Sequence, residues 1–122
     1  MCKIKFIMRT LDTINQIISK CENTFELIGR DEEINDNLFF YDDLDAEWNS
    51  GKSLSSIFDE TIGLDEFPGS GYYINPIYDN DLPPLKEVEL WYGEYNDPVF
   101  GDVSINVLKC RDDIIASNYS CD

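Results

Sequence analysis

Two runs of alternating apolar and polar residues constrain the fold of this 122-residue chain more than any other feature. Val88, Leu90 and Tyr92 alternate with Glu87, Glu89 and Trp91, and Val103, Ile105 and Val107 alternate with Ser104 and Asn106. Alternation with a period of two is typical of half-buried antiparallel strands. Breaks are expected at Pro83-Pro84 and at Asn96-Asp97-Pro98, and a further strand at residues 72–74.

A helix is expected after Thr10, which is a suitable N-cap. The apolar positions with helical spacing are Leu11, Ile14, Ile18, Cys21, Phe25 and Ile28. Gly29 then stands where a left-handed residue would end the helix. Because residues 23–25 are mediocre helix formers, a second interpretation stays open, in which the helix ends near Cys21 and a strand follows.

The remaining segments predict shorter elements. Short strands are expected at residues 2–8 and 38–41, a turn at 49–51 and a loop at 68–71. A second helix is expected after Ser53, with Leu54, Ile57, Phe58 and Ile62 on one face. The economical architecture is one α+β domain, in which one or two helices pack on one face of a mostly antiparallel sheet.

Acidic residues are in large excess and unevenly distributed. The chain has 25 Asp and Glu against nine Lys and Arg, for a net charge of −16 and a pI near 4.1. Residues 1–30 carry a net +2 and form a scaffold segment, whereas residues 31–122 carry a net −18. Such a field repels nucleic acids and anionic membranes, which are bound through clustered bases. The expected partner is therefore cationic, either a metal ion or a basic protein.

The sequence gives little support for an enzyme or for a metal-binding protein. The chain has no histidine, the usual base of serine and cysteine nucleophiles, so no enzyme activity and no cofactor are expected. Its four cysteines form no CxxC pair, which argues against zinc and for free thiols. An EF-hand starting at Asp43 is excluded because Trp48 replaces the required glycine and Leu54 the final glutamate. With no export signal or apolar span, the expected location is the cytoplasm.

Acids interleaved with aromatic residues instead indicate a protein-binding surface, in which charge steers the encounter and aromatic anchors hold the complex. The predicted partner-binding residues are Tyr41, Asp42, Asp43, Asp45, Glu47, Trp48, Asp59, Glu60, Asp65, Glu66, Glu89, Trp91, Glu94, Tyr95 and Asp97. This surface is centred on residues 41–48, with 59–66 and 87–97 as neighbours. Phe39 and Tyr92 are expected in the core, whereas exposed and buried positions are equally open for Trp48.

In size, charge and composition the whole chain resembles the immunity proteins of bacterial toxin-immunity systems, including contact-dependent inhibition and nuclease bacteriocins. The resemblance is one of overall character and transfers no signature residue. It implies a tight complex with a basic nuclease toxin domain, in which carboxylates occupy the positions of nucleic-acid phosphates.

Three alternatives remain beside that resemblance. The first is a phage or plasmid DNA mimic that inhibits a host nuclease in restriction or CRISPR defence. Because turns and strands separate the acidic clusters, a compact plug is favoured over an elongated mimic. The second is an irregular calcium-binding module that uses Asp42, Asp43 and Asp45, or Asp79 and Asp81. The third is a structural subunit whose charge serves only solubility.

Overall fold

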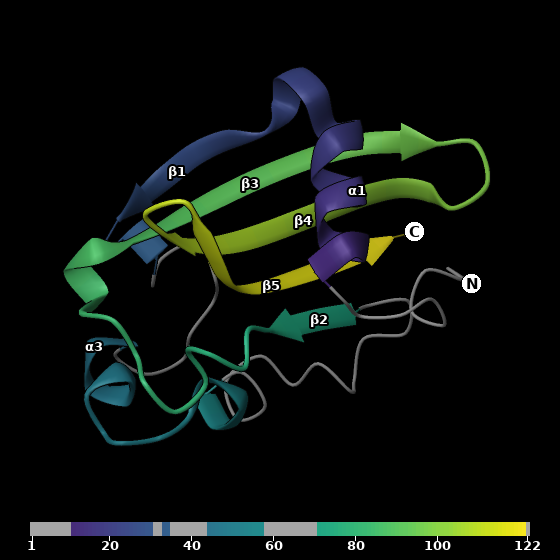
Figure 1. The fold of residues 1–122 in the computed structure, drawn as a ribbon. Coiled ribbons are helices and arrows are strands. Elements are labelled where there is room, and N and C mark those ends of the chain that lie inside the picture. The colour runs from purple at the N-terminus through teal and green to yellow at the C-terminus, as the bar shows by residue number, and fades with distance from the viewer. Residues whose placement is uncertain (1–10, 31–32, 35–43, 58–70, 122) are drawn as a thin grey trace.

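A computed structural model of the chain describes residues 11–30, 33–34, 44–57 and 71–121. Its centre is a five-stranded sheet in the order β1-β3-β4-β5-β2, with every neighbouring pair antiparallel (Figure 1). The strands are β1 (Glu26–Arg30), β2 (Gly71–Ile74), β3 (Val88–Asp97), β4 (Gly101–Cys110) and β5 (Asp113–Cys121). The helical elements are α1 (Leu11–Cys21), η2 (Glu22–Thr24), α3 (Leu44–Trp48) and η4 (Leu85–Glu87). The predicted α+β class with an antiparallel sheet is confirmed.

The β3–β4 hairpin forms the middle of the sheet, and its strands pair without interruption from Val88↔Cys110 to Asp97↔Gly101. Gly101 has a φ of +82°, a conformation that glycine adopts readily, where the turn enters β4. The alternation predicted for β4 is confirmed, because Val103, Ile105 and Val107 are buried and Ser104 and Asn106 are not. In β3 it holds for Val88 and Leu90, which are buried, whereas Tyr92 is half-buried. The hairpin extends past α1 (Figure 1).

The basic N-terminal segment follows the second of the two interpretations. Helix α1 ends at Cys21, the short η2 follows, and β1 pairs with β3 from Glu26↔Tyr92 to Arg30↔Glu89. The predicted role of Gly29 as a helix terminator is wrong, because this residue lies buried within β1. A Cβ atom there would meet the Glu33 side chain. Pairing with the neighbouring strand has overridden the helical spacing of Phe25 and Ile28.

The sheet carries a hydrophobic core on each face. On one face, the α1 core consists of Ile14, Ile17, Cys21, Val103, Ile105, Val107 and Tyr119. The other face carries the α3 core, made of Ile34, Trp48, Leu54, Ile57, Val88, Leu90, Leu108, Cys110, Ile115 and Ala116. The adjacent residues Val107 and Leu108 belong to different cores, as expected when successive side chains of a strand point to opposite faces. Helix α1 covers one face as predicted, and residues of α3 lie in the core of the other.

Three local expectations have mixed outcomes. Residues 54–57 are helical and Ser53 is their cap, because its Oγ accepts a hydrogen bond from the Ser56 N–H over 3.2 Å. Strand β5 was not expected, because a bulge opposite Leu108 and Lys109 interrupts its alternation and brings Ile115 and Ala116 into one core. The strands predicted at 2–8 and 38–41 lie outside the described residues.

None of the described helices has the length and apolar character needed to cross a membrane.

Candidate functional site

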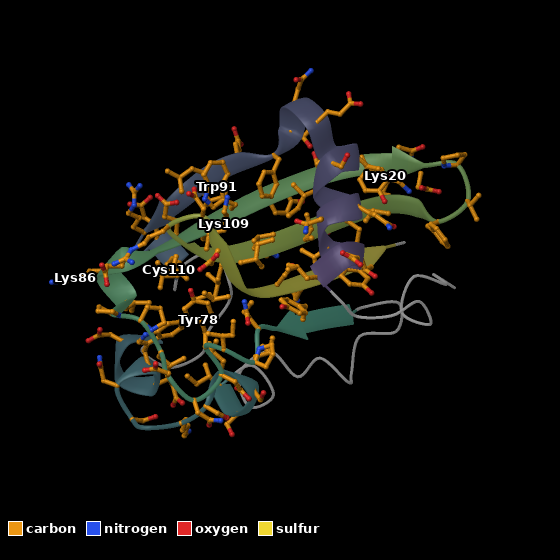
Figure 2. All side chains as sticks on the ribbon, viewed as in Figure 1. Lys20, Tyr78, Lys86, Trp91, Lys109 and Cys110 are labelled. Carbon is orange, nitrogen blue, oxygen red and sulfur yellow. The ribbon has the colours of Figure 1, made fainter. Side chains whose placement is uncertain are left out.

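Most bases of the described residues lie beside acids or aromatic rings. The ion pairs are Lys20–Asp97 at 3.8 Å, Lys52–Glu47 at 2.9 Å, Arg111–Glu87 at 3.6 Å and Arg30–Glu89. Lys109 lies over the Trp91 ring, 5.2 Å from its centroid, and Figure 2 shows both side chains near the same part of β3 and β4. Lys86 belongs to η4, at the end of β3 away from the hairpin turn (Figure 2). The basic side chains of the described residues therefore lie outside one region of the sheet.

That region is the half of the α3-core face nearest the hairpin turn, here called the acidic sheet face. Its residues are Glu26, Tyr92, Glu94, Asn96, Asp102, Ser104, Asn106 and Asn118, which strand register places on one side of the sheet. None of them belongs to either hydrophobic core. Its three carboxylates, on Glu26, Glu94 and Asp102, are exposed, and no base of the described residues lies on it.

Neutral donors orient two of these carboxylates. The Tyr92 hydroxyl donates to Glu94 Oε2 over 3.1 Å, and the Asn96 side-chain amide donates to Asp102 Oδ1 over 2.7 Å. Glu94 lies opposite Ser104 in the register, and Asp102 lies opposite Asn96, so the two acids are diagonal neighbours across the hairpin. Both accept hydrogen bonds from neutral donors, whereas Glu47 and Glu89 form ion pairs with bases.

A cavity of about 530 Å³ opens at this place, within the range of about 300–1,000 Å³ typical of binding pockets. Its lining residues are Thr24, Tyr92, Glu94, Tyr95, Asn96, Asp102, Val103 and Ser104. Thr24 closes the edge of β3 beyond the start of β1, because its Oγ1 accepts from the Glu94 N–H over 3.1 Å and lies 2.6 Å from the Glu94 carbonyl. Burial, with the Glu94 carboxylate beside it, raises the pKa of the Tyr92 hydroxyl, which therefore stays a hydrogen-bond donor.

Trp91 and Glu89 lie on the opposite face, at the side of α1. The Trp91 ring stacks on Phe25 with centroids 5.3 Å apart, and its Nε1 donates to Glu89 over 3.2 Å. That hydrogen bond, together with Arg30 and Lys109, lowers the pKa of the Glu89 carboxyl. The predicted position of Trp91 opposite Leu90 is confirmed, but the surface around it is of mixed charge.

Tyr95 and Asp97 share that face and support the end of the hairpin. The Asp97 carboxylate accepts from the N–H groups of Val99 and Phe100 over 2.8 and 3.1 Å, and these bonds lower its pKa, with a further contribution from Lys20. Lys20 Nζ also lies 5.8 Å from the centroid of the Tyr95 ring. Asp97 thus fixes the turn, and of the predicted β3 residues Glu94 alone belongs to the acidic sheet face.

The structure corrects the predicted role of one residue, Trp48, at residues 41–48, the predicted centre of the partner-binding surface. Trp48 is 5 % exposed, lies in the α3 core, and donates from Nε1 to the Pro83 carbonyl over 2.8 Å. Its assignment as a surface anchor is wrong, because the short helix α3 turns this side chain toward the sheet. Glu47 pairs with Lys52, and Asp45 is exposed. The predicted residues Tyr41, Asp42, Asp43, Asp59, Glu60, Asp65 and Glu66 lie outside the described part of the chain, as does Phe39.

Sequence reasoning predicted only Glu94 among the residues of the acidic sheet face and missed the others. Tyr92 was expected in the core but is half-buried and belongs to neither core. Glu26, Asp102 and Ser104 were not considered as site residues. The alternation of β4 could have indicated two of these residues. Since Val103 points into the core, its neighbours Asp102 and Ser104 must point to the other face of the sheet.

Within the described ranges, no group of three or more His, Cys, Asp or Glu residues is arranged to hold a metal ion. Asp79, a candidate calcium ligand, accepts from the Ser55 backbone N–H and hydroxyl over 2.9 and 3.0 Å. No protein-family model matches the chain, and no significant match was found among curated proteins or solved structures.

Proposed function

We propose that the protein is an inhibitor of the immunity type, which binds a cationic nuclease toxin domain and blocks the surface that this domain uses for nucleic acid. The acidic sheet face carries the proposal. It presents exposed carboxylates of Glu26, Glu94 and Asp102 on a paired β-scaffold, and the described bases lie elsewhere. A nuclease binds phosphates through clustered bases, and such a cluster complements this surface.

The rigidity of the surface supports inhibition by a preformed plug. Glu94 and Asp102 project from the two longest strands, whose register is continuous over the whole hairpin. Side chains held before the encounter lose less conformational entropy on binding, so the same contacts yield a tighter complex. Charge on one face also raises the association rate of a basic partner.

The test is recovery of a partner from the native host by the tagged full-length chain at low salt. The expected result is a basic protein that elutes as salt rises and whose nuclease activity falls in proportion to added inhibitor. Coexpression with the product of the neighbouring gene provides the direct version of the experiment. If neither approach recovers a basic protein, the inhibitor function is wrong.

Two outcomes of the same experiment separate the immunity function from its alternatives. A recovered toxin encoded beside this chain supports immunity, whereas a host restriction or CRISPR nuclease supports a DNA mimic. Calorimetric titration of the isolated chain with Ca²⁺ provides the comparison with a calcium module, for which saturable binding at physiological salt is expected.

A further inference from the structure

The cavity beside Glu94 and Asp102 has the chemistry of a site for one side chain of a partner. It lies at the edge of the acidic sheet face, between η2, β3 and β4. On the acidic sheet face its lining combines the half-buried Tyr92, the exposed Glu94 and Asp102 carboxylates, and the hydroxyls of Thr24 and Ser104. Among the described residues its lining includes no base, so a cationic guest is complementary and an anionic guest is repelled.

We propose that this cavity receives the guanidinium group of an arginine on the partner protein. The proposal rests on the inhibitor function above and names the chemical group that is recognised. A guanidinium has five N–H donors in a planar fork, which suits acceptors that approach from different directions. Glu94 and Asp102 are diagonal neighbours across the hairpin, at a Cα separation of about 7–8 Å. One planar fork reaches both carboxylates more readily than the compact lysine ammonium.

The aromatic lining favours the same group. Tyr92 is half-buried at the cavity and its hydroxyl is bonded to Glu94, whereas the Tyr95 ring packs against the α1 core on the other face of the sheet. Arginine stacks on aromatic faces while its edge donates hydrogen bonds, so the Tyr92 ring and the carboxylates serve one guest together. A metal ion is less well matched, because no suitable cluster of three ligands occurs in the described segments.

The test is an NMR titration of the full-length chain at low salt with L-arginine amide as the probe. L-lysine amide measures the contribution of charge alone, and L-citrulline amide is nearly isosteric but has a neutral side chain. Arginine amide is expected to shift the backbone amide signals of residues 92–96 and 102–104. Its affinity is expected to exceed those of the other two probes by about threefold or more. Equal binding of the lysine and arginine probes overturns the proposal.

Two double variants that remove the same amount of negative charge test whether arginine amide binds in the cavity. Glu94→Gln with Asp102→Asn removes both cavity carboxylates, whereas Asp81→Asn with Asp112→Asn removes two exposed carboxylates elsewhere. The first pair is expected to weaken arginine amide binding about tenfold, and the second to leave it nearly unchanged. The single variant Asp102→Asn provides the same comparison if the double variant does not fold. A folded cavity variant that binds as tightly as the surface control overturns the assignment.

The two proposals fail in different ways. If a basic partner is recovered but the cavity variants bind both it and arginine amide normally, the arginine site is wrong and the inhibitor function stands. If arginine amide binds in the cavity but no basic partner is recovered, the inhibitor function is wrong. With a partner in hand, replacing its interface arginines one at a time by lysine is expected to reveal one position whose effect disappears when Glu94 and Asp102 are neutralised.

Discussion

The indole nitrogen of Trp48 donates a hydrogen bond to the backbone carbonyl of Pro83 over 2.8 Å, which joins α3 to the segment that precedes η4. The ring lies in the α3 core with Leu90 and Leu108 of the central strands. A tryptophan within an acidic segment of the sequence therefore contributes to folding. The effects of substituting Trp48 should therefore follow from its burial and from its hydrogen bond to Pro83, and not from the acidic residues beside it in the sequence.

Trp48→Ala is expected to lower the free energy of unfolding by about 3–5 kcal/mol, because it leaves a cavity in the core. Trp48→Phe keeps a ring there but leaves the Pro83 carbonyl without its donor, for an expected loss of about 1–3 kcal/mol. Urea denaturation followed by circular dichroism measures both losses. The exposed Asp45→Asn, in the same helix, is the control and should change stability little. A Trp48→Phe protein of unchanged stability would contradict the structural role.

Gly93→Ala is expected to destabilise the protein by about 1–3 kcal/mol through overpacking against α1. An added Cβ would lie 2.9 Å from Cys21 Sγ and 3.0 Å from Phe25 Cδ1. Because Cys21→Ala removes the sulfur, the double variant should lose less stability than the two single losses added together. Additive losses in a double-mutant cycle would show that the two residues do not crowd each other.

Alkaline pH is expected to destabilise the fold. Burial raises the pKa of the hydroxyls of Tyr73, Tyr92 and Tyr95, and a hydrogen bond to Asp113 raises the pKa of Tyr78. Since the folded pKa exceeds the unfolded one, the stabilisation is complete below about pH 10 and is lost as the pH rises through the folded values. The urea midpoint should stay constant up to about pH 9 and fall as the pH rises above about pH 10, as tyrosinate absorbance rises.

Tyr78→Phe is the matched variant for this pH dependence, since it removes one titrating group and its bond to Asp113. The urea midpoint of this variant should be lower than that of the wild type at neutral pH, and the difference between the two midpoints should narrow as the pH rises. A constant difference across the range would exclude Tyr78 as a contributor.

Charge reversal separates the acidic sheet face from the acidic segment that the sequence emphasises. Glu26→Lys, Glu94→Lys and Asp102→Lys together are expected to reduce the association rate with the basic partner by about tenfold or more at low salt. Asp42→Lys, Asp43→Lys and Asp45→Lys change the net charge equally and should have a smaller effect. Stopped-flow association at several salt concentrations provides the measurement. If the second triple variant is the slower one, the interface is centred on residues 41–48.

The candidate site was only partly accessible from sequence. Glu94 was predicted, but on one surface with Glu89, Trp91 and Asp97, which strand register places on the other side of the sheet. Asp102 and Ser104 were missed because their importance depends on pairing with Asn96 and Glu94 across the hairpin. Pairs of this kind are separated along the chain, and composition does not indicate them.

The sequence by itself determined the net charge of −16, the two alternating central strands and a helix that includes Leu11, Ile14 and Ile18, because each depends on composition or on local periodicity. Only the tertiary structure decided that α1 stops at Cys21, that Trp48 is buried, and that the described bases leave one sheet face acidic. These features depend on contacts between distant segments. Pairing with β3 outweighs the helical preference after Cys21, and burial against β3 and β4 outweighs the acidic surroundings of Trp48.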